Sequence, residues 1–356
     1  MRILQVLPYF CFGGAETMCE NLTCALMAQG HEVTVVSLYG ERTPISRRME
    51  EAGVRIIYLD KRLGLDISMV PKLKRIMKEE KPDVVHTHLD VIKYAVAAAR
   101  LAGAPKCVHT VHNVADKEAE GKAQKAINGF YFRRGWSVPV ALSPEVQASV
   151  MAFYGLKKER VPVAYNGVDL SRCLPKESYR AGEEFHILHI GRFNEQKNHE
   201  LLLKVFRRLS QENPGLRLEL IGEGELRQKL ERQAVALGID KRIVFLGAQT
   251  NVYPYLQKAD LFLLPSRYEG IPMTIIEAMG TGLPIVATAV GGVPDMLQNG
   301  VDGFTVPCEE EEITEACAKV IRDEGLRERL GRAARENARR FSAEAMGKRY
   351  VEIYTK

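Results

Sequence analysis

The order of apolar and polar residues predicts alternating strands and helices from the start of the chain. Residues 2–8 form an apolar run typical of a strand buried in a parallel sheet. A helical pattern follows to about Gln29, and Gly30 is a suitable residue to end it. The alternation continues with strands expected at 33–38, 54–59, 84–86, 106–111 and 138–142, and helices at 69–79, 91–101 and 117–134. It predicts a parallel sheet covered on both faces.

A second series of the same kind follows a polar stretch around Pro175 and Gly182, which we interpret as a linker. Strands are expected at 185–190, 216–221, 243–246, 259–264, 285–287 and 304–306. Helices are expected at 199–211, 225–237, near 252, from about 272, and at 314–323, 326–340 and 343–354. The sequence therefore predicts an α/β protein with two doubly wound, Rossmann-like domains. Such sheets bind ligands at the carboxyl ends of their strands.

Composition narrows the class of protein. The 356 residues suffice for two domains, and 46% hydrophobic with 27% charged residues is typical of a soluble globular protein. Seven cysteines without a C-x-x-C pair predict neither a disulfide framework nor a zinc site, which fits a reducing cytoplasm. The first residues lack the pattern of a signal peptide, and no apolar run is long enough for a membrane span. We therefore expect a cytoplasmic location.

The net charge of +5 is concentrated in the first half of the chain. Residues 1–169 contain 23 Lys and Arg against 18 Asp and Glu, and the remainder contains 27 of each. No nucleic-acid-binding motif accompanies the excess, so nucleic acid is not expected as a partner. Weak attraction to anionic lipid or to a phosphorylated acceptor remains open beside an ordinary solvated surface.

The strongest candidate for chemistry is the stretch EGIPMTIIEAM at residues 269–279, which follows an expected strand. Pro272 suits the first position of a helix, so the helix N-terminus lies between Glu269 and Glu277. A helix N-terminus attracts an anion such as a diphosphate, and Gly270 lets the backbone approach a ligand. The two carboxylates would repel a bare phosphate but can accept hydrogen bonds from hydroxyls on either side of it, as in a nucleotide sugar. A capped helix with two solvated glutamates is the alternative.

A basic pair lies in the loop after the first strand of the second series. Arg192 and Lys197 can hold a diphosphate, Arg through a planar fork and Lys through a point charge. If that diphosphate is a leaving group, these cations act where charge develops. No Asp-x-Asp motif occurs, which argues against a metal-held diphosphate. Two ordinary surface cations are the alternative interpretation.

Gly13 and Gly14 join the first strand to its helix, where small residues let backbone N–H groups face an anion. A tight turn explains them equally well. A dinucleotide site is disfavoured, because G-x-G-x-x-G is missing and the second strand does not end in an acidic residue.

Four histidines cluster in the first half. His86 and His88 face the same side if their strand continues, but no third residue at a suitable spacing completes a metal site. His109 lies within a strand and is expected in the core. His112 lies just beyond that strand, where a ligand-binding residue is expected.

The expected helix 117–134 combines basic and apolar residues. It carries Lys117, Lys122, Lys125, Arg133 and Arg134 together with Ile127 and Phe130. Such a helix can lie at a membrane surface, although most such helices simply keep their cations in water.

These stretches together resemble the retaining glycosyltransferases of family 4, which have the GT-B fold. The two glutamates separated by seven residues are the family's mark, and AMGTGLPIVAT at 278–288 and GGVPD at 291–295 are also similar to it. The resemblance implies that Glu269 contacts the donor sugar and Glu277 the ribose, with Gly270 and Ile271 in the same site. It implies further that Arg192 and Lys197 form the family's basic pair, that Gly13 and Gly14 lie over the donor phosphates, and that His112 contacts the sugar near the reacting carbon.

The resemblance also sets the domain and function expectations. Residues 1–170 would bind the acceptor, joined by a last helix at 343–356, and residues 171–342 would bind the nucleotide sugar. The expected reaction transfers a hexosyl or N-acetylhexosaminyl group, with a UDP-sugar as expected donor, to a hydroxyl of a glycan or lipid-linked acceptor in cell-surface polysaccharide biosynthesis. No metal or other cofactor is expected, and peripheral association with the inner face of the membrane is open.

Two other functions fit the same fold. A nucleotide-sugar epimerase would need no acceptor. A non-catalytic sugar-binding subunit would be expected to lack site residues, whereas Glu269, Glu277, Arg192, Lys197 and His112 are all present.

Overall fold

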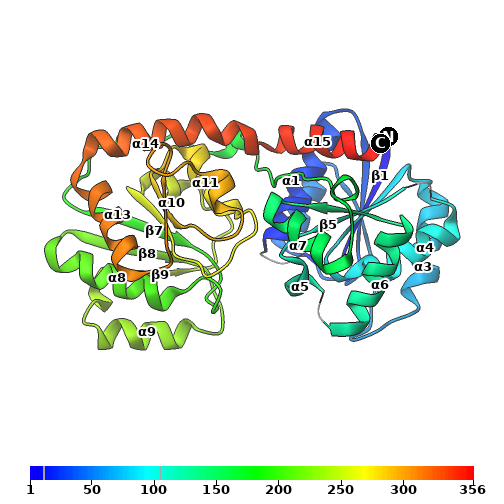
Figure 1. Ribbon diagram of the computed structural model, residues 1–356, viewed down its shortest axis with the longest axis horizontal. Coiled ribbons are helices and arrows are strands. Elements are labelled where there is room, and N and C mark those ends of the chain that lie inside the picture. Colours follow the sequence, from blue (N-terminus) through cyan, green and yellow to red (C-terminus); the bar gives the residue numbers. More distant parts are fainter. Residues whose placement is uncertain (11–12, 105, 120) are drawn as a thin grey trace. The chain divides into compact units, whose positions relative to one another are not determined.

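The computed structural model describes residues 1–10, 13–104, 106–119 and 121–356 (Figure 1). Its internal contacts divide the chain into two units. Unit 1 comprises Met1–Gly167 and Ala343–Lys356, and unit 2 comprises Val168–Ser342. Each unit is built on a six-stranded sheet, and all strand pairs are parallel. The predicted pair of doubly wound α/β domains is confirmed.

Unit 1 has the strand order β3-β2-β1-β4-β5-β6. Its strands are β1 (Arg2–Leu7), β2 (Glu32–Ser37), β3 (Arg55–Tyr58), β4 (Val84–His88), β5 (Cys107–Val111) and β6 (Val138–Ala141). Its helices are α1 (Gly14–Ala28), α2 (Pro44–Glu51), α3 (Met69–Glu80), α4 (Ile92–Ala102), α5 (Ala115–Glu118), α6 (Gly121–Arg134), α7 (Pro144–Tyr154) and α15 (Ala343–Thr355). The order reverses between β1 and β4, which is the usual place for a ligand at the carboxyl ends of the strands.

The apolar runs of unit 1 explain why its sheet is covered on both faces. Every residue of β4 and β5 is buried, as expected of central parallel strands. Helix α15 packs against α1 and contributes Met346, Tyr350 and Tyr354 to the core on one side. The end of the chain is therefore part of the core of unit 1.

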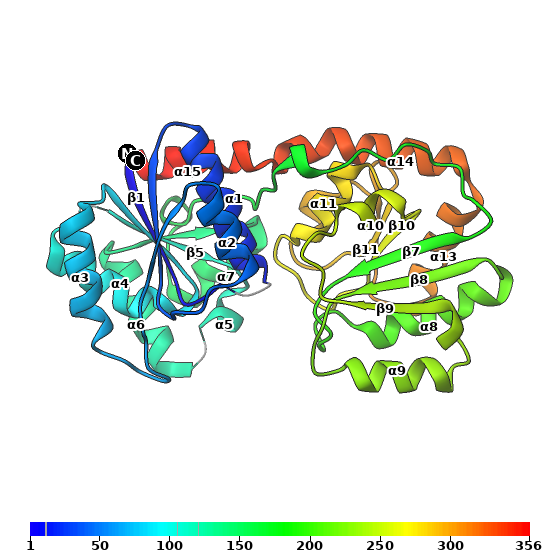
Figure 2. The same ribbon diagram turned by 180° about the vertical axis from the view of Figure 1, so that it is seen from behind.

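Unit 2 has the strand order β12-β11-β10-β7-β8-β9. Its strands are β7 (Phe185–Ile190), β8 (Leu216–Ile221), β9 (Ile243–Gly247), β10 (Leu261–Leu264), β11 (Ile285–Thr288) and β12 (Phe304–Val306). Its helices are α8 (His199–Glu212), α9 (Arg227–Ala236), α10 (Tyr253–Lys258), α11 (Met273–Thr281), α12 (Val293–Met296), α13 (Glu310–Arg322) and α14 (Glu324–Asn337). Helix α8 packs beside α9 and α13, and α11 packs beside α10 and α14 (Figure 2).

Two helices of unit 1 were not predicted, and they share a cause. Helix α2 begins after Thr43 and helix α7 after Ser143, and in both the first helical residue is a proline. A hydroxyl side chain caps the N-terminus in each case, accepting from the backbone N–H three residues later. A Ser or Thr followed by Pro therefore marks the start of a helix here, although such a pair is also common in turns.

The single helix expected over 117–134 is wrong. The structure has α5, which ends at Glu118, and α6, which begins at Gly121. Gly121 has a φ of 86°, a conformation that interrupts a right-handed helix.

Candidate functional site

A buried ion pair lies at the carboxyl ends of the central strands of unit 2. The Nζ atom of Lys197 lies 2.6 Å from Oε1 of Glu269, and their side chains are only 16% and 5% exposed. The hydroxyl of Ser266 donates to the same carboxylate oxygen at 2.5 Å. Thr288 in turn donates to the carbonyl of Ser266 at 2.6 Å. Lys197 follows β7, Ser266 and Glu269 follow β10 and Thr288 ends β11, so the strand order brings them together.

The backbone of Glu269 lies against a glycine that no other residue could replace without strain. Gly291 has a φ of 58°, and a Cβ atom there would lie 1.8 Å from the carbonyl oxygen of Glu269. The N–H of Gly292 donates to the carbonyl of Gly270 at 3.0 Å. The GGVPD segment therefore holds the Glu269 loop in place from the side of β11.

Helix α11 begins at Met273, with Pro272 as its N-cap residue. The predicted start is thus displaced by one residue, and Glu269 lies in the preceding loop as predicted. Ile271 is buried beside it. Glu277 lies in the second turn of α11 and is 9% exposed.

Burial raises the pKa of the Glu277 carboxyl to about 7, and the Arg172 guanidinium opposes that shift only partly. Arg172 lies over the ring of Tyr253, 5.0 Å from its centroid. Among the described residues, no hydrogen bond reaches the Glu277 carboxyl oxygens, so they are available to a ligand.

The raised pKa of Glu277 predicts a pH-dependent affinity for a ligand that donates hydroxyl hydrogens to it. The carboxylate is the better acceptor, and it forms only as the pH rises through about 7. Affinity for the expected UDP-sugar donor, measured by calorimetry between pH 5.5 and 8.5, should rise toward pH 7 by up to about tenfold per unit and then level off. The Glu277→Gln variant, which cannot titrate, should give a flat profile, and Glu277→Ala should bind more weakly than Glu277→Gln. A sloping profile in the Gln variant would contradict this role.

The loop at residues 191–198 orients its two cations differently. Arg192 is 74% exposed and lies 3.9 Å from Glu225, whereas Lys197 turns inward to Glu269. The loop packs closely against the residues that follow β8. The backbone N–H of Phe193 donates to the carbonyl of Glu223 at 2.9 Å, and a Cβ on Gly222 would lie 2.0 Å from the carbonyl oxygen of Gly191. Arg192 and Lys197 are the two residues predicted to bind an anion, and these contacts hold the backbone between them in place. The exposed side chain of Arg192 can rotate toward a ligand.

Gly13 and Gly14 lie where the sequence predicted, at the start of α1. Gly13 is the N-cap residue, and the space where a Cβ of Gly14 would point is open. Phe12, which precedes them in the predicted loop, lies outside the described residues.

His112 lies just past β5, and its half-buried ring touches a second histidine. Its Nε2 atom lies 3.1 Å from Nδ1 of His88. The backbone N–H groups of His112 and Asn113 donate to Oε2 of Glu118 at 3.1 and 3.0 Å. Burial lowers the pKa of His112 to about 3, so its ring is neutral near pH 7. Burial also raises the pKa of Glu118 to about 7.

The other histidines of the cluster are enclosed by protein groups. His86 and His88 lie on one side of β4 with ring centroids 4.3 Å apart, as predicted, and His109 is in the core, as predicted. His86 bonds to the hydroxyls of Tyr354 and Thr110, both at 2.7 Å. Within the part of the chain that the structure describes, no group of three or more His, Cys, Asp or Glu side chains could hold a metal ion.

Comparison with known proteins decides the family. The model of the Glycosyltransferase Family 4 domain matches residues 12–172, and the model of the Glycosyl transferases group 1 domain matches residues 174–337. Together the two models account for nearly the whole chain. The chain is a family 4 glycosyltransferase.

Two relatives of this glycosyltransferase are themselves named as glycosyltransferases. It is 28% identical over 348 residues to the lipopolysaccharide core biosynthesis glycosyltransferase LpsE of Rhizobium meliloti, covering 96% of this chain and 95% of that protein. It is 29% identical over 259 residues to the UDP-Gal:α-D-GlcNAc-diphosphoundecaprenol α-1,3-galactosyltransferase of Escherichia coli, covering 68% of this chain and 66% of that protein.

A solved structure with the same fold is that of Anabaena HepE in complex with UDP-glucose. The TM-score is 0.86 at 22% identity, and the match covers 100% of this chain and 99% of that one. This likeness confirms the predicted GT-B fold.

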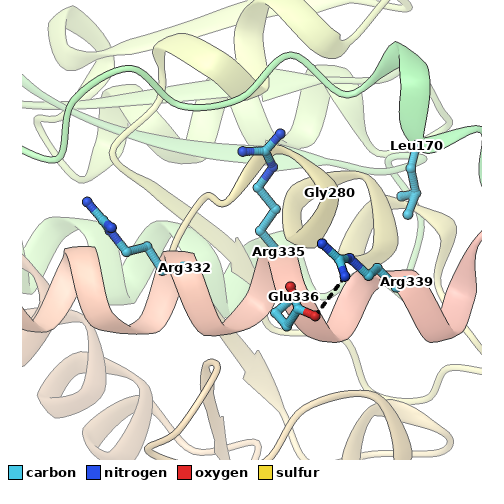
Figure 3. A pocket seen from close by; sticks show the side chains of 6 residues that line it. All are labelled: Leu170, Gly280, Arg332, Arg335, Glu336 and Arg339. Carbon is cyan, nitrogen blue, oxygen red and sulfur yellow. Dashed lines mark ion pairs between the residues drawn. The ribbon is translucent and has the colours of Figure 1, made fainter.

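A cavity of this glycosyltransferase has none of the predicted donor residues in its lining. It has a volume of about 490 Å³ and is lined by Leu170, Gly280, Arg332, Arg335, Glu336 and Arg339 (Figure 3). Arg332 and Arg339 are more than 70% exposed; Arg332 pairs with Glu328 within α14, and Arg339, in the 3-10 turn that follows α14, pairs with Glu336. Because Arg332 and Arg339 are exposed to solvent and paired with glutamates, we assign no ligand to this cavity.

Several residues around the predicted site carried no signal that sequence reasoning could use. Ser266 stands in the quoted loop before Glu269, but a lone serine there does not show that it donates to that carboxylate. Arg172 acts on Glu277 from the stretch interpreted as the domain border. Gln5 contacts His88 through a pairing that needs the strand order, and Glu118 contacts His112 from the short helix α5.

No helix in the described ranges, which omit residues 11–12, 105 and 120, has both the length and the apolar character needed to cross a membrane.

Proposed function

We propose that this glycosyltransferase transfers a hexosyl or N-acetylhexosaminyl group from a UDP-sugar to a hydroxyl of a glycan or lipid-linked acceptor, with retention of anomeric configuration. The observation that carries the proposal is the pair of buried carboxylates around the N-terminus of α11. Glu269 is held by Lys197 and Ser266, whereas among the described residues no hydrogen bond reaches the carboxyl of Glu277, which only the charge of Arg172 influences. The names of the relatives from Escherichia coli and Rhizobium support an acceptor in surface glycan synthesis.

Each group in unit 2 has a distinct proposed task. The helix N-terminus and the two cations of the 191–198 loop bind the diphosphate and stabilise it as it leaves. Glu277 accepts hydrogen bonds from the ribose hydroxyls. Glu269 accepts from a sugar hydroxyl while Ser266 keeps its carboxylate oriented.

Retention is proposed to follow front-face attack, in which the departing diphosphate takes the proton of the acceptor hydroxyl. The bond from the anomeric carbon to the diphosphate breaks, and the bond to the acceptor oxygen forms on the same face. Glu269 is assigned to binding, not to nucleophilic attack, because Lys197 and Ser266 already share its oxygen Oε1. His112, neutral near pH 7, is proposed to hydrogen-bond a hydroxyl of the sugar.

The test is a ligand screen followed by product analysis. UDP-, GDP- and ADP-sugars should be compared by thermal unfolding, since a ligand at about 100 times its dissociation constant adds roughly 2.7 kcal/mol. A UDP-sugar should stabilise the protein most. Incubation with that sugar alone then separates transfer from epimerisation: conversion of the donor without an acceptor would indicate an epimerase. Stabilisation by no nucleotide sugar would favour a non-catalytic subunit.

Transfer is proposed to need no divalent metal, because cationic side chains replace it at the diphosphate. Activity should therefore be unchanged within about twofold after treatment with EDTA. The sequence motivates this expectation through Arg192 and Lys197 and the missing Asp-x-Asp motif. Loss of activity that magnesium or manganese restores would refute it.

Peripheral membrane association is proposed to use the loop at residues 61–68, not α6. In α6, Phe132 is buried in the core and Phe130 is 42% exposed, whereas Leu63, Leu65 and Ile67 are 91%, 76% and 76% exposed. Hydrogen bonds within the loop fix its shape: Lys61 Nζ donates to the carbonyls of residues 62 and 64, and Asp66 accepts from the N–H groups of residues 62 and 68. Three aliphatic side chains beside two cations fit an anionic lipid surface.

The loop predicts binding to vesicles that contain phosphatidylglycerol. Replacing Leu63, Leu65 and Ile67 together by serine should weaken co-flotation at least about tenfold, since burying one such side chain is worth about 1.5–3 kcal/mol. Leu101→Ser is the matched control, because Leu101 is also exposed but lies on α4 outside the loop. Equal flotation of the triple variant and the wild type would rule this surface out.

A further inference from the structure

Three side chains from neighbouring central strands of unit 1 form a row of hydrogen bonds that ends at His112. Gln5 lies on β1, His88 ends β4, and His112 follows β5. Oε1 of Gln5 lies 3.0 Å from Nε2 of His88, and Nδ1 of His88 lies 3.1 Å from Nε2 of His112. Gln5 and His88 are fully buried, so water does not compete for these bonds.

The surroundings of Gln5 set the direction in which protons point along this row. The amide nitrogen of Gln5 donates to Oγ1 of Thr23 at 2.7 Å. The thiol of Cys19 donates to Oε1 of Gln5 at 3.4 Å, and burial raises the pKa of that thiol so that it remains protonated. The oxygen of Gln5 therefore faces His88, and an amide oxygen can only accept. The hydrogen between Gln5 and His88 must be on Nε2 of His88.

The tautomer of His88 then determines the tautomer of His112. A neutral imidazole carries one N–H and one lone pair, so Nδ1 of His88 is an acceptor. The hydrogen between the two rings must belong to Nε2 of His112. Nδ1 of His112 is thereby left unprotonated, and among the described residues no hydrogen bond reaches it.

We propose that His88 is a positioning residue that holds His112 in its Nε2–H tautomer, so that Nδ1 of His112 presents a lone pair to a sugar hydroxyl. The identity of that hydroxyl donor rests on the proposed function; the tautomer does not. Fixing the tautomer also fixes the ring, because a flipped ring would place a carbon atom against Nδ1 of His88.

The same sheet contains a histidine of the opposite tautomer, which serves as an internal reference. The hydroxyl of Thr87 donates to the carbonyl of Val108 at 3.2 Å and lies 2.9 Å from Nδ1 of His109. Because the hydroxyl hydrogen is used, Nδ1 of His109 must carry the proton. His109 and His112 should therefore differ in tautomer although they are three residues apart.

The first experiment measures the tautomers directly. The protein, with its eight histidines labelled with ¹⁵N, is examined by two-bond proton–nitrogen correlation, with assignments from single histidine variants. An unprotonated ring nitrogen resonates far downfield of a protonated one. His112 should show an unprotonated Nδ1 and His109 an unprotonated Nε2. A protonated Nδ1 in wild-type His112 would overturn the proposal.

A variant of Gln5, at the other end of the row, tests whether the Gln5 oxygen sets the tautomer of His112. Gln5→Glu keeps an acceptor toward His88, so His112 should keep its tautomer. If the Gln5 amide instead donated to His88, this variant would reverse the tautomer of His112, and that reversal would overturn the proposal.

Variants of His88 separate positioning from packing. In His88→Asn the amide oxygen can take the place of Nδ1 and accept from His112, whereas His88→Leu offers no acceptor. The Leu variant should give a mixture of His112 tautomers and a kcat about 10- to 100-fold lower, the range seen when the partner that orients a metal-bound histidine is removed. The Asn variant should keep the tautomer and most of kcat, and both should change KM for the donor little.

His31→Asn, which removes a histidine elsewhere in unit 1, controls for labelling and assay. A Leu variant that folds, keeps one His112 tautomer and turns over like wild type would overturn the proposal. If no sugar transfer is found for wild type, the proposed function fails while the spectra still decide the tautomer.

Discussion

Replacement of Lys197 by alanine is expected to lower kcat for sugar transfer by about a hundredfold or more. Removing one donor to charge that develops in the transition state typically costs about 3 kcal/mol. In the proposed reaction the diphosphate gains charge as it leaves, so the loss should fall on kcat more than on donor affinity. Single-turnover kinetics at saturating enzyme measures the chemical step itself.

The structure adds a second effect of the same change, which must be separated from the first. Lys197 Nζ lies 2.6 Å from a buried carboxylate, and removing one partner of a buried pair costs about 3–5 kcal/mol of folding free energy. The Lys197→Ala/Glu269→Gln double variant removes the unpaired charge, so it should recover stability in urea unfolding. It should not recover kcat.

Arg192→Lys is the matched comparison, because Arg192 is exposed and its replacement should leave stability unchanged. It should still slow transfer, since an ammonium cannot reproduce a bidentate fork. A Lys197→Ala variant with a wild-type chemical step and weaker donor binding would reduce Lys197 to a docking residue.

Replacement of Gly291 by alanine is expected to destabilise unit 2 by about 2–5 kcal/mol. The left-handed conformation costs a residue with a Cβ about 1–2 kcal/mol, and forced overpacking about 1–3 kcal/mol more. Here the overpacking is against backbone, because the Cβ would lie 1.8 Å from the carbonyl oxygen of Glu269. Urea unfolding of the full chain measures the loss.

Gly300→Ala separates the two costs. Gly300 has a φ of 76° but nothing within 4 Å of its Cβ position, so only the conformational cost applies. The Gly291 variant should lose clearly more stability than the Gly300 variant, and it should also bind the donor more weakly because the Glu269 loop must shift. Equal losses of unfolding free energy in the two variants would show that the Glu269 loop moves away from the added Cβ at no cost in stability.

The fold was largely predictable because apolar periodicity and glycine placement are local signals. The strands β1, β7 and β8 begin and end where the pattern placed them, to within one residue. The predictions of helices failed where two local signals in the sequence disagreed. Thr43-Pro44 and Ser143-Pro144 look like turns until the cap is seen, and Gly121 interrupts a helical pattern that its neighbours favour.

The sequence predicted which residues belong to the candidate site, but not which of them contact each other. The spacing of Glu269 and Glu277 is visible in the sequence, but the contact between Lys197 and Glu269 joins residues 72 apart. It exists because β7 and β10 are neighbours in the sheet, and alternation of strands and helices does not specify that order. The row from Gln5 through His88 to His112 needs the adjacency of β1, β4 and β5 for the same reason.

The position of α15 has a consequence for synthesis on the ribosome. Unit 2 is one continuous segment, Val168–Ser342, and all of it has been translated before the last helix is made. Unit 1 takes Met346, Tyr350 and Tyr354 into its core, and the hydroxyl of Tyr354 bonds to buried His86. Although domains usually fold from the N-terminus during synthesis, unit 1 is translated first and completed last. Until residue 354 has left the ribosome, the core residues of α15 are missing from unit 1. We therefore expect a nascent unit 1 to expose apolar surface and to bind chaperones at that stage.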